Sequence, residues 1–208
     1  MSTSTVNANS GIRPGPGLER IIFFSDAVIA IAVTLLAVDI KPPEVDPSQL
    51  VSALSAFTPR FGSFALSFMI IASFWIGHHI TFSYIRTYDY KLAWLNILFL
   101  LFIALTPFAS SMLGMYPFNI TVLVVYSAVI AMAGFFRASI WEYAARGHRL
   151  VDSDLSQDII RKMSIRNFIA PVTFAISGPL VLVNVAFVAV WIIVPISIVA
   201  YRKIPKGR

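Results

Sequence analysis

The chain has 208 residues, of which 58% are hydrophobic and only 12% are charged, and its formal net charge at pH 7 is +6. Soluble domains average about 25% charged residues, so this composition, with a mean hydropathy of +0.80, predicts a membrane protein without a sizeable soluble domain. The sequence contains no cysteine, which excludes disulfides, thiol catalysis and cysteine metal sites.

The predicted elements begin after residues 1–17, a segment rich in Ser, Asn, Gly and Pro that is expected to be disordered. It lacks the basic-then-apolar pattern of a cleaved signal peptide. Six apolar spans follow and form a predicted domain over residues 18–203, ahead of a short basic tail at 204–208. The spans cover residues 18–40, 61–85, 91–113, 118–143, 163–177 and 180–201.

The last two spans come from one apolar run that is too long for a single comfortable span, and we expect the chain to reverse at Gly178-Pro179. Six spans place both termini on one side of the membrane, together with all but two of the 16 Lys and Arg residues. The exceptions are Lys41 and Arg60. Because basic loops remain in the cytoplasm, this pattern predicts that both termini are cytoplasmic, and it explains the positive charge without a nucleic-acid ligand.

The first span carries the strongest functional signal, because Asp26 lies near the start of an apolar stretch. An ionisable residue within lipid costs about 2.5 kcal/mol or more, so Asp26 is expected to have a partner, a water-filled cavity or a function. One face of this helix is apolar with a single hydroxyl, and Asp26 lies about 140° away from Ile31 on that wheel. The face comprises Phe24, Ala27, Ile31, Thr34, Leu35 and Val38.

Two interpretations of this helix remain open from the residues alone. In the first, the apolar face packs against lipid or neighbouring helices and Asp26 bonds a buried donor. In the second, the face lines a pore and Asp26 locks the helix in place. Arg20 and Asp26 are too far apart for an i,i+4 pair, so each is expected to find its partner on another helix. Ser25 is expected to bond back to its own backbone.

The second and third spans carry further polar residues. His78 and His79 point about 100° apart, which makes a poor metal site; hydrogen bonding in a helix seam and proton sensing are both open. Asn96 is expected to form an interhelical hydrogen bond, and Pro107 to kink or break its helix. The sequence shows no nucleophile–base pair, phosphate-binding glycine loop or acidic metal cluster, so we expect neither an enzyme, a metal site nor a cofactor.

Arg20, Phe24, Ser25 and Asp26 match the RxxxFSD signature of the transmembrane protein 175 family, which the chain resembles over most of its length. Two further patterns of that family follow in order, FWxxHH at residues 74–79 and WLNxLFLLFxALxPF at residues 94–108. The resemblance implies an all-α, six-helix subunit unlike ordinary potassium channels, without their TVGYG filter. It also implies a homotetramer in a bacterial inner membrane.

By resemblance, the first helix of each subunit lines a central pore, with the constriction at Ile31 and a pore-lining hydroxyl at Thr34. Potassium is then expected to pass transiently near these two residues. The predicted pore-lining residues are Ala27, Ile31, Thr34, Leu35 and Val38. The predicted polar network that holds the helix comprises Arg20, Phe24, Ser25, Asp26, Trp75, His78, His79 and Asn96.

The predicted function is therefore a potassium-preferring cation channel that works by passive flux, with membrane lipids and further copies of the chain as partners. The alternative is a proton-coupled secondary transporter that uses Asp26 or a histidine, which would show slow, saturable flux instead of single-channel steps. A membrane-embedded enzyme is a weaker rival, because the sequence offers no catalytic constellation.

Overall fold

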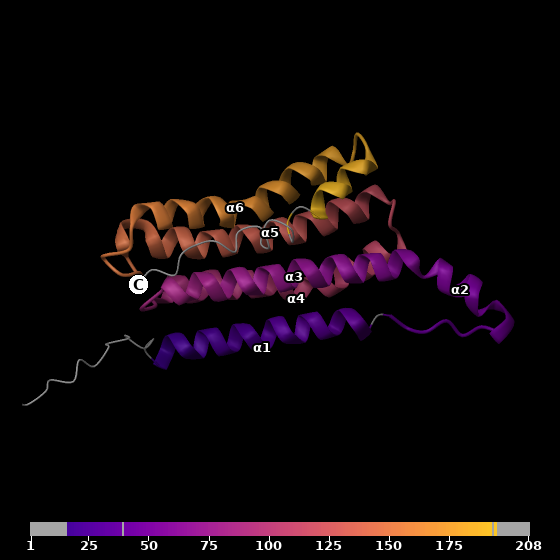
Figure 1. The fold of residues 1–208 in the computed structure, drawn as a ribbon, viewed down its shortest axis with the longest axis horizontal. Helices are drawn as coiled ribbons and strands as arrows, with labels where there is room; N and C mark the ends of the chain where they lie inside the picture. Colours follow the sequence, from indigo (N-terminus) through magenta and orange to yellow (C-terminus); the bar gives the residue numbers. More distant parts are fainter. Residues whose placement is uncertain (1–15, 39, 193, 195–208) are drawn as a thin grey trace, which may run out of the picture.

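The computed structural model describes residues 16–38, 40–192 and 194, which form an elongated helical bundle (Figure 1). The long helices are α1 (Pro16–Val38), α3 (Thr58–Tyr84), α4 (Tyr90–Met115), α5 (Ile120–Ala145) and α6 (Gln157–Leu180). The shorter elements are η1 (Pro47–Gln49), α2 (Leu50–Ala56), η2 (Arg146–His148) and η3 (Val185–Ile192). No strand occurs in the described residues, and the predicted all-α class is confirmed.

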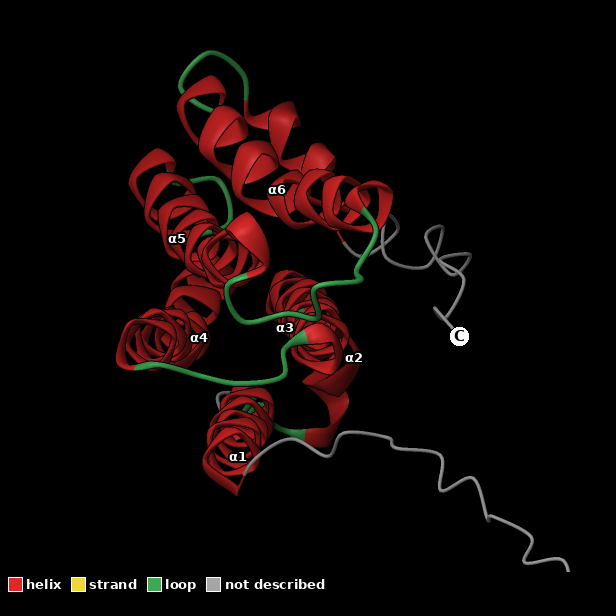
Figure 2. Ribbon diagram, turned by 90° about the vertical axis from the view of Figure 1, so that its left-hand side faces the viewer, coloured by secondary structure: helices red, strands yellow, loops and turns green. Residues whose placement is uncertain are grey.

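The long helices stack in layers, with α1 on one side, α3 and α4 in the middle, and α5 and α6 on the other side (Figure 2). α1 packs mainly against α3 and α4, α4 also packs against α5, and α6 packs on α5. Large apolar side chains fill the spaces between these layers; Phe74, Phe99, Ile103, Ile130 and Trp141 are at most 1% exposed. α1 is therefore an edge helix of the bundle, held by two neighbours.

Polar side chains begin three of the long helices. Asp89, Asn119 and Ser156 accept hydrogen bonds from backbone amides in the first turns of α4, α5 and α6. These caps satisfy amide groups that a helix start leaves without an intrahelical partner. α4 continues through Pro107, so the helix break considered from the sequence does not form.

The reversal expected at Gly178-Pro179 comes later in the structure. Both residues lie within α6, and the chain turns over residues 181–184. Gly178 is needed for packing instead, because a Cβ at this position would collide with Ser127 of α5. After the turn, Trp191 packs back on α6 and donates a hydrogen bond from Nε1 to Ser177 Oγ at 2.7 Å. The predicted sixth span beyond residue 194, residues 1–15 and the tail at 204–208 lie outside the described residues.

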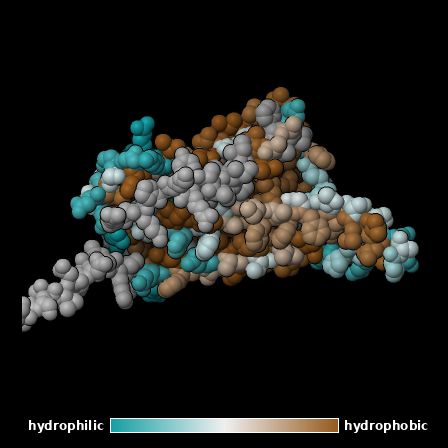
Figure 3. Space-filling view, in the orientation of Figure 1, coloured by the Kyte–Doolittle hydropathy of each residue, from teal (hydrophilic) through white to brown (hydrophobic). Residues whose placement is uncertain are grey.

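Four described helices, α1, α3, α4 and α5, are long and apolar enough to cross a membrane. Hydrophobic side chains occupy the middle of the face shown in Figure 3, and hydrophilic side chains gather at its two ends. α6 is more polar because its first half carries Asp158, Arg161, Lys162 and Arg166. The distribution is that of a multi-pass membrane protein.

Candidate functional site: the first helix and its polar anchor

α1 has one buried and one exposed face. Ser25, Ile29, Ala32 and Leu36 are at most 3% exposed, and α1 meets α3 and α4 through this side. Their spacing of three, four and seven residues places them on a single side of a helix with 3.6 residues per turn. This spacing defines the side of α1 that packs into its own bundle.

The residues predicted to line a pore lie on the exposed side of α1. Ile31, Leu35 and Val38 are 59%, 46% and 66% exposed, and Ala27 and Thr34 are also exposed. The Thr34 hydroxyl donates to the Ile31 carbonyl oxygen at 2.8 Å, which leaves the lone pairs of Oγ1 available on this face. A single subunit therefore leaves a large apolar face uncovered, with one hydroxyl oxygen among its side chains.

Asp26 connects α1 to α3 at the edge of their contact. Its Oδ1 accepts a hydrogen bond of 2.9 Å from the indole Nε1 of Trp75. Asp26 is half-buried, Trp75 is 44% exposed, and both border an open groove with a volume of about 400 Å³. Within the described chain no cation forms a salt bridge with Asp26. The carboxylate therefore has one N–H donor in its own subunit and an accessible second oxygen.

A buried chain of hydrogen bonds joins α1, α4 and α3. Asn96 Nδ2 donates to Ser25 Oγ at 2.8 Å, and Asn96 Oδ1 lies 2.9 Å from His78 Nε2. Because an amide oxygen only accepts, His78 carries its proton on Nε2 in this pairing. Ser25 donates in turn to the carbonyl oxygen of Ile21 at 2.8 Å. Ser25, Asn96 and His78 are at most 1% exposed, so this chain of bonds fixes the rotation of α1 in a site that water does not reach.

The other predicted members of the polar network do not join these bonds. Arg20 is exposed and makes no side-chain hydrogen bond or salt bridge to any described residue, so the structure contains no interhelical partner for it. Phe24 is 56% exposed. His79 is exposed, and its ring centroid lies 6.2 Å from that of Trp75. These three side chains face away from the interior of the subunit.

Arg137 of α5 is a buried polar residue that was not predicted as part of a site, because in the sequence it counts only among the basic residues of the predicted cytoplasmic side. It is 3% exposed, and its Nη1 donates to Asn167 Oδ1 at 2.7 Å. Its guanidinium carbon lies 5.5 Å from the centre of the Phe74 ring. Gly77 of α3 makes room for it, since a Cβ there would lie 2.5 Å from Nη1. The sequence feature that could have indicated this buried site is an arginine inside an apolar span.

Metal-ligating side chains are not clustered in the described part of the chain: no group of three or more His, Cys, Asp or Glu residues could hold an ion. The polar groups beside α1 are instead arranged to position a helix. Each buried donor or acceptor in the Ser25–Asn96–His78 chain comes from a different helix, and the exposed face of α1 carries no fixed charge between Ala27 and Val38.

Comparison with known proteins identifies the family of the chain. Residues 20–107 match the family described as Endosomal/lysosomal potassium channel TMEM175. A protein of Streptomyces collinus named as a potassium channel is 39% identical over 153 residues, which are 71% of this chain and 74% of that protein. A second one, from Chamaesiphon minutus, is 29% identical over 86% of this chain and 89% of its own length. The human endosomal/lysosomal proton channel TMEM175 is 34% identical over 61% of this chain and 28% of that protein.

Solved structures agree with these sequence matches. The crystal structure of a lysosomal potassium-selective channel TMEM175 homolog from Chamaesiphon minutus has a TM-score of 0.79 at 25% identity, covering 90% of this chain and 99% of that one. A variant of the potassium channel MtTMEM175 shares the fold, with a TM-score of 0.65 at 18% identity. These relatives are ion channels, which removes the membrane-embedded enzyme considered from the sequence. The chain belongs to the TMEM175 family of ion channels.

Proposed function

We propose that the chain is a passive, potassium-preferring cation channel in a bacterial inner membrane. The Streptomyces and Chamaesiphon relatives, which match most of the chain, are named potassium channels, and the similar crystal structure is described as potassium-selective. The human relative is named a proton channel, so protons are a second permeant ion to be measured.

The observation that carries this proposal is the exposed apolar face of α1. An edge helix with Ile31, Leu35 and Val38 uncovered is incomplete as a single subunit. Four copies arranged around an axis would bring these faces together and repeat each residue as a ring. We therefore propose a homotetramer with a central pore lined by Ala27, Ile31, Thr34, Leu35 and Val38.

The proposed selectivity follows from the chemistry of these rings. Four isoleucines at position 31 form a neck that offers no oxygen ligands, so a cation must shed part of its water there. Sodium holds its hydration water more tightly than potassium, so the neck penalises sodium more. The Thr34 oxygen, which keeps its lone pairs on the same face, offers contact to an ion next to the neck.

The bonds behind α1 have a supporting role in this mechanism. Asp26 with Trp75, and Ser25 with Asn96 and His78, resist rotation of α1 about its axis. A turn of one residue position, about 100°, would move Ile31 off the pore axis. The exposed Arg20, Phe24 and His79 are proposed to contact neighbouring subunits.

The proposed channel domain covers residues 18–203, with both termini in the cytoplasm. The support is the distribution of basic residues, because only Lys41 and Arg60 lie on the opposite side of the predicted membrane. Membrane lipids surround the remaining apolar surface.

The decisive test is conduction by Ile31→Asn in planar bilayers, with potassium on one side and sodium on the other. The polar side chain replaces part of the lost hydration, so conductance should rise and the reversal potential should move toward zero. Thr34→Ala should weaken selectivity with a smaller change in conductance, because it removes only a hydroxyl.

Ile97→Asn is the matched control. Ile97 is 45% exposed on α4, so the same substitution places the same amide on a helix away from the proposed pore. Ile29 is unsuitable because it is 2% exposed and Asn there would disrupt packing. If Ile31→Asn retains the original reversal potential and conductance while Ile97→Asn changes both, the pore face has been assigned to the wrong helix.

A further inference from the structure

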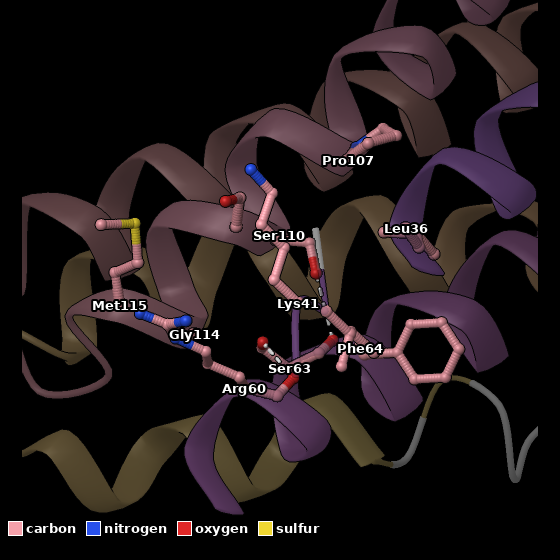
Figure 4. Close-up of a pocket in the computed structure, with 11 residues that line it drawn as sticks. Leu36, Lys41, Arg60, Ser63, Phe64, Pro107, Ser110, Gly114 and Met115 are labelled. Carbon is pink, nitrogen blue, oxygen red and sulfur yellow. Dashed lines mark hydrogen bonds between the residues drawn. The ribbon is translucent and has the colours of Figure 1, made fainter. Parts of the chain in front are cut away.

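A pocket with both polar and apolar lining residues lies at the end of the bundle opposite the start of α1. It is formed by the segment after α1, the first turns of α3 and the last turns of α4, and its volume is about 280 Å³ (Figure 4). This is close to the lower end of the range for ligand pockets, about 300 Å³. It is separate from the exposed face of α1 and from the Asp26–Trp75 bond.

The pocket gathers two cations that are distant in the sequence. Lys41 follows α1, and Arg60 lies in the first turn of α3; both line the cavity, and no acidic residue does. Neither forms a salt bridge in the described residues. The Arg60 guanidinium carbon lies 5.0 Å from the centre of the Phe57 ring, a contact that leaves its N–H groups available. Two positive charges therefore share this pocket without a carboxylate among its lining residues.

Three serines also line the pocket, and one of them keeps its hydroxyl donor available. Ser63 donates to the Arg60 carbonyl oxygen at 2.9 Å, and Ser110 donates to the Ser63 carbonyl oxygen at 3.2 Å. Ser111 is half-buried, lines the same pocket and makes no side-chain hydrogen bond with the described residues, so its hydroxyl is available to a ligand. Gly114 forms part of the wall, because a Cβ there would lie 2.7 Å from Ser63 Oγ and 3.1 Å from the Arg60 Cα.

The position of Lys41 and Arg60 in the sequence also supports a ligand-binding role for the pocket. Lys41 and Arg60 are the two basic residues on the side of the predicted membrane from which Lys and Arg are otherwise excluded. Positive charges on that side act against the insertion preference that keeps basic loops in the cytoplasm. The fold nevertheless brings Lys41 and Arg60 to one cavity. Apolar residues, including Leu36, Phe64 and Met115, line the rest of that cavity, so it suits a ligand with an anionic group and an apolar part.

We propose that this pocket binds a phosphate-type oxyanion, held by Lys41, Arg60 and the Ser111 hydroxyl. The anion is the headgroup phosphate of an anionic phospholipid or a free phosphate ion, because both present the same acceptor oxygens to a guanidinium and an ammonium group. The site does not depend on ion conduction, so this proposal can be correct even if the proposed pore is not.

The test measures binding to the purified full-length chain in detergent micelles. In one arm, phosphatidylglycerol or phosphatidylcholine is titrated and bound lipid is counted by native mass spectrometry. In the other arm, inorganic phosphate is titrated and the midpoint temperature of unfolding is followed. Lys41→Gln/Arg60→Gln should weaken binding of the effective ligand at least tenfold. Arg146→Gln/Arg161→Gln, which removes two exposed charges at the other end of the bundle, should leave it unchanged.

Ser111→Asp is the second variant, because it keeps both cations and places a carboxylate beside them. It should also abolish anion binding, and it provides an independent test if the double variant fails to fold. Binding of phosphatidylglycerol alone assigns the site to a lipid, and a response to inorganic phosphate alone assigns it to a soluble anion. Phosphatidylglycerol binding no tighter than phosphatidylcholine, with no response to phosphate, overturns the proposal. Equal losses in the Lys41/Arg60 variant and the Arg146/Arg161 control overturn it as well.

Discussion

Asn96→Ala should be the most destabilising polar substitution beside α1. It removes the two interhelical bonds, of 2.8 and 2.9 Å, that Asn96 makes to Ser25 and His78. Interhelical bonds in membrane proteins average about 0.6 kcal/mol each. His78 would lose its acceptor at Nε2, and its Nδ1 already has no hydrogen-bond partner in the described residues. A buried polar group left without a partner costs about 1–3 kcal/mol, so we expect a total loss of about 3 kcal/mol.

The free energy of unfolding can be measured by reversible SDS titration in micelles, followed by circular dichroism. Asn119→Ala is the matched control; Asn119 is an exposed helix cap, so its loss should cost about 1 kcal/mol. Ser25→Ala should also cost about 1 kcal/mol, because it leaves one amide hydrogen of Asn96 unpaired. The double variant Asn96→Leu/His78→Phe should lose less free energy of unfolding than its two single variants lose in sum, because both polar partners are removed together. Equal losses for Asn96→Ala and Asn119→Ala, or strict additivity of the double variant, would refute this account.

Two further predictions concern Asp89 and the topology. Desolvation raises the pKa of Asp89, but hydrogen bonds from the Tyr143 hydroxyl and the Leu92 and Lys91 amides, together with the positive charge of Arg149, hold that pKa below its usual value. Their stabilisation is complete above the unfolded pKa and is lost as pH falls through the folded one, so Asp89→Asn should flatten the acid side of a Tm–pH profile. Because the chain has no native cysteine, Asp46→Cys and Asp154→Cys can report topology: a membrane-impermeant maleimide should label position 46 but not 154 in intact cells. The reverse labelling pattern would contradict cytoplasmic termini.

The long helices could be predicted because each condition for a membrane span is local. An apolar stretch of sufficient length must satisfy its backbone as a helix, and its ends are marked by capping residues such as Asp89 and Asn119. The helical repeat is local in the same way, and the residues that the repeat groups with Ile31 on one face of α1 are exposed in the structure. That Asp26 would have a partner on another helix could also be expected from the energy of a carboxylate in lipid.

The identity of the partners could not be predicted, because it depends on how helices are rotated against each other. Ser25 and Asn96 are 71 residues apart, and no periodicity in either helix indicates that they meet. The same limit applies to Arg137, whose burial depends on Gly77 of α3 and Asn167 of α6. Residues 47–56 lie between the first two predicted spans, and the short helices η1 and α2 that they form could not be predicted because they have no long apolar face to detect.

The exposed face of α1 has two interpretations: it lines the proposed pore, or it faces lipid. The apolar side chains on its exposed face would be satisfied in lipid, and Thr34 would be tolerated there because it donates to its own backbone. Asp26 is the residue that distinguishes the two environments. With one bond from Trp75 and an accessible second oxygen, its carboxylate would cost about 2.5 kcal/mol or more in hydrocarbon. We therefore propose that water or a neighbouring subunit covers this edge of α1, as the proposed tetramer would allow.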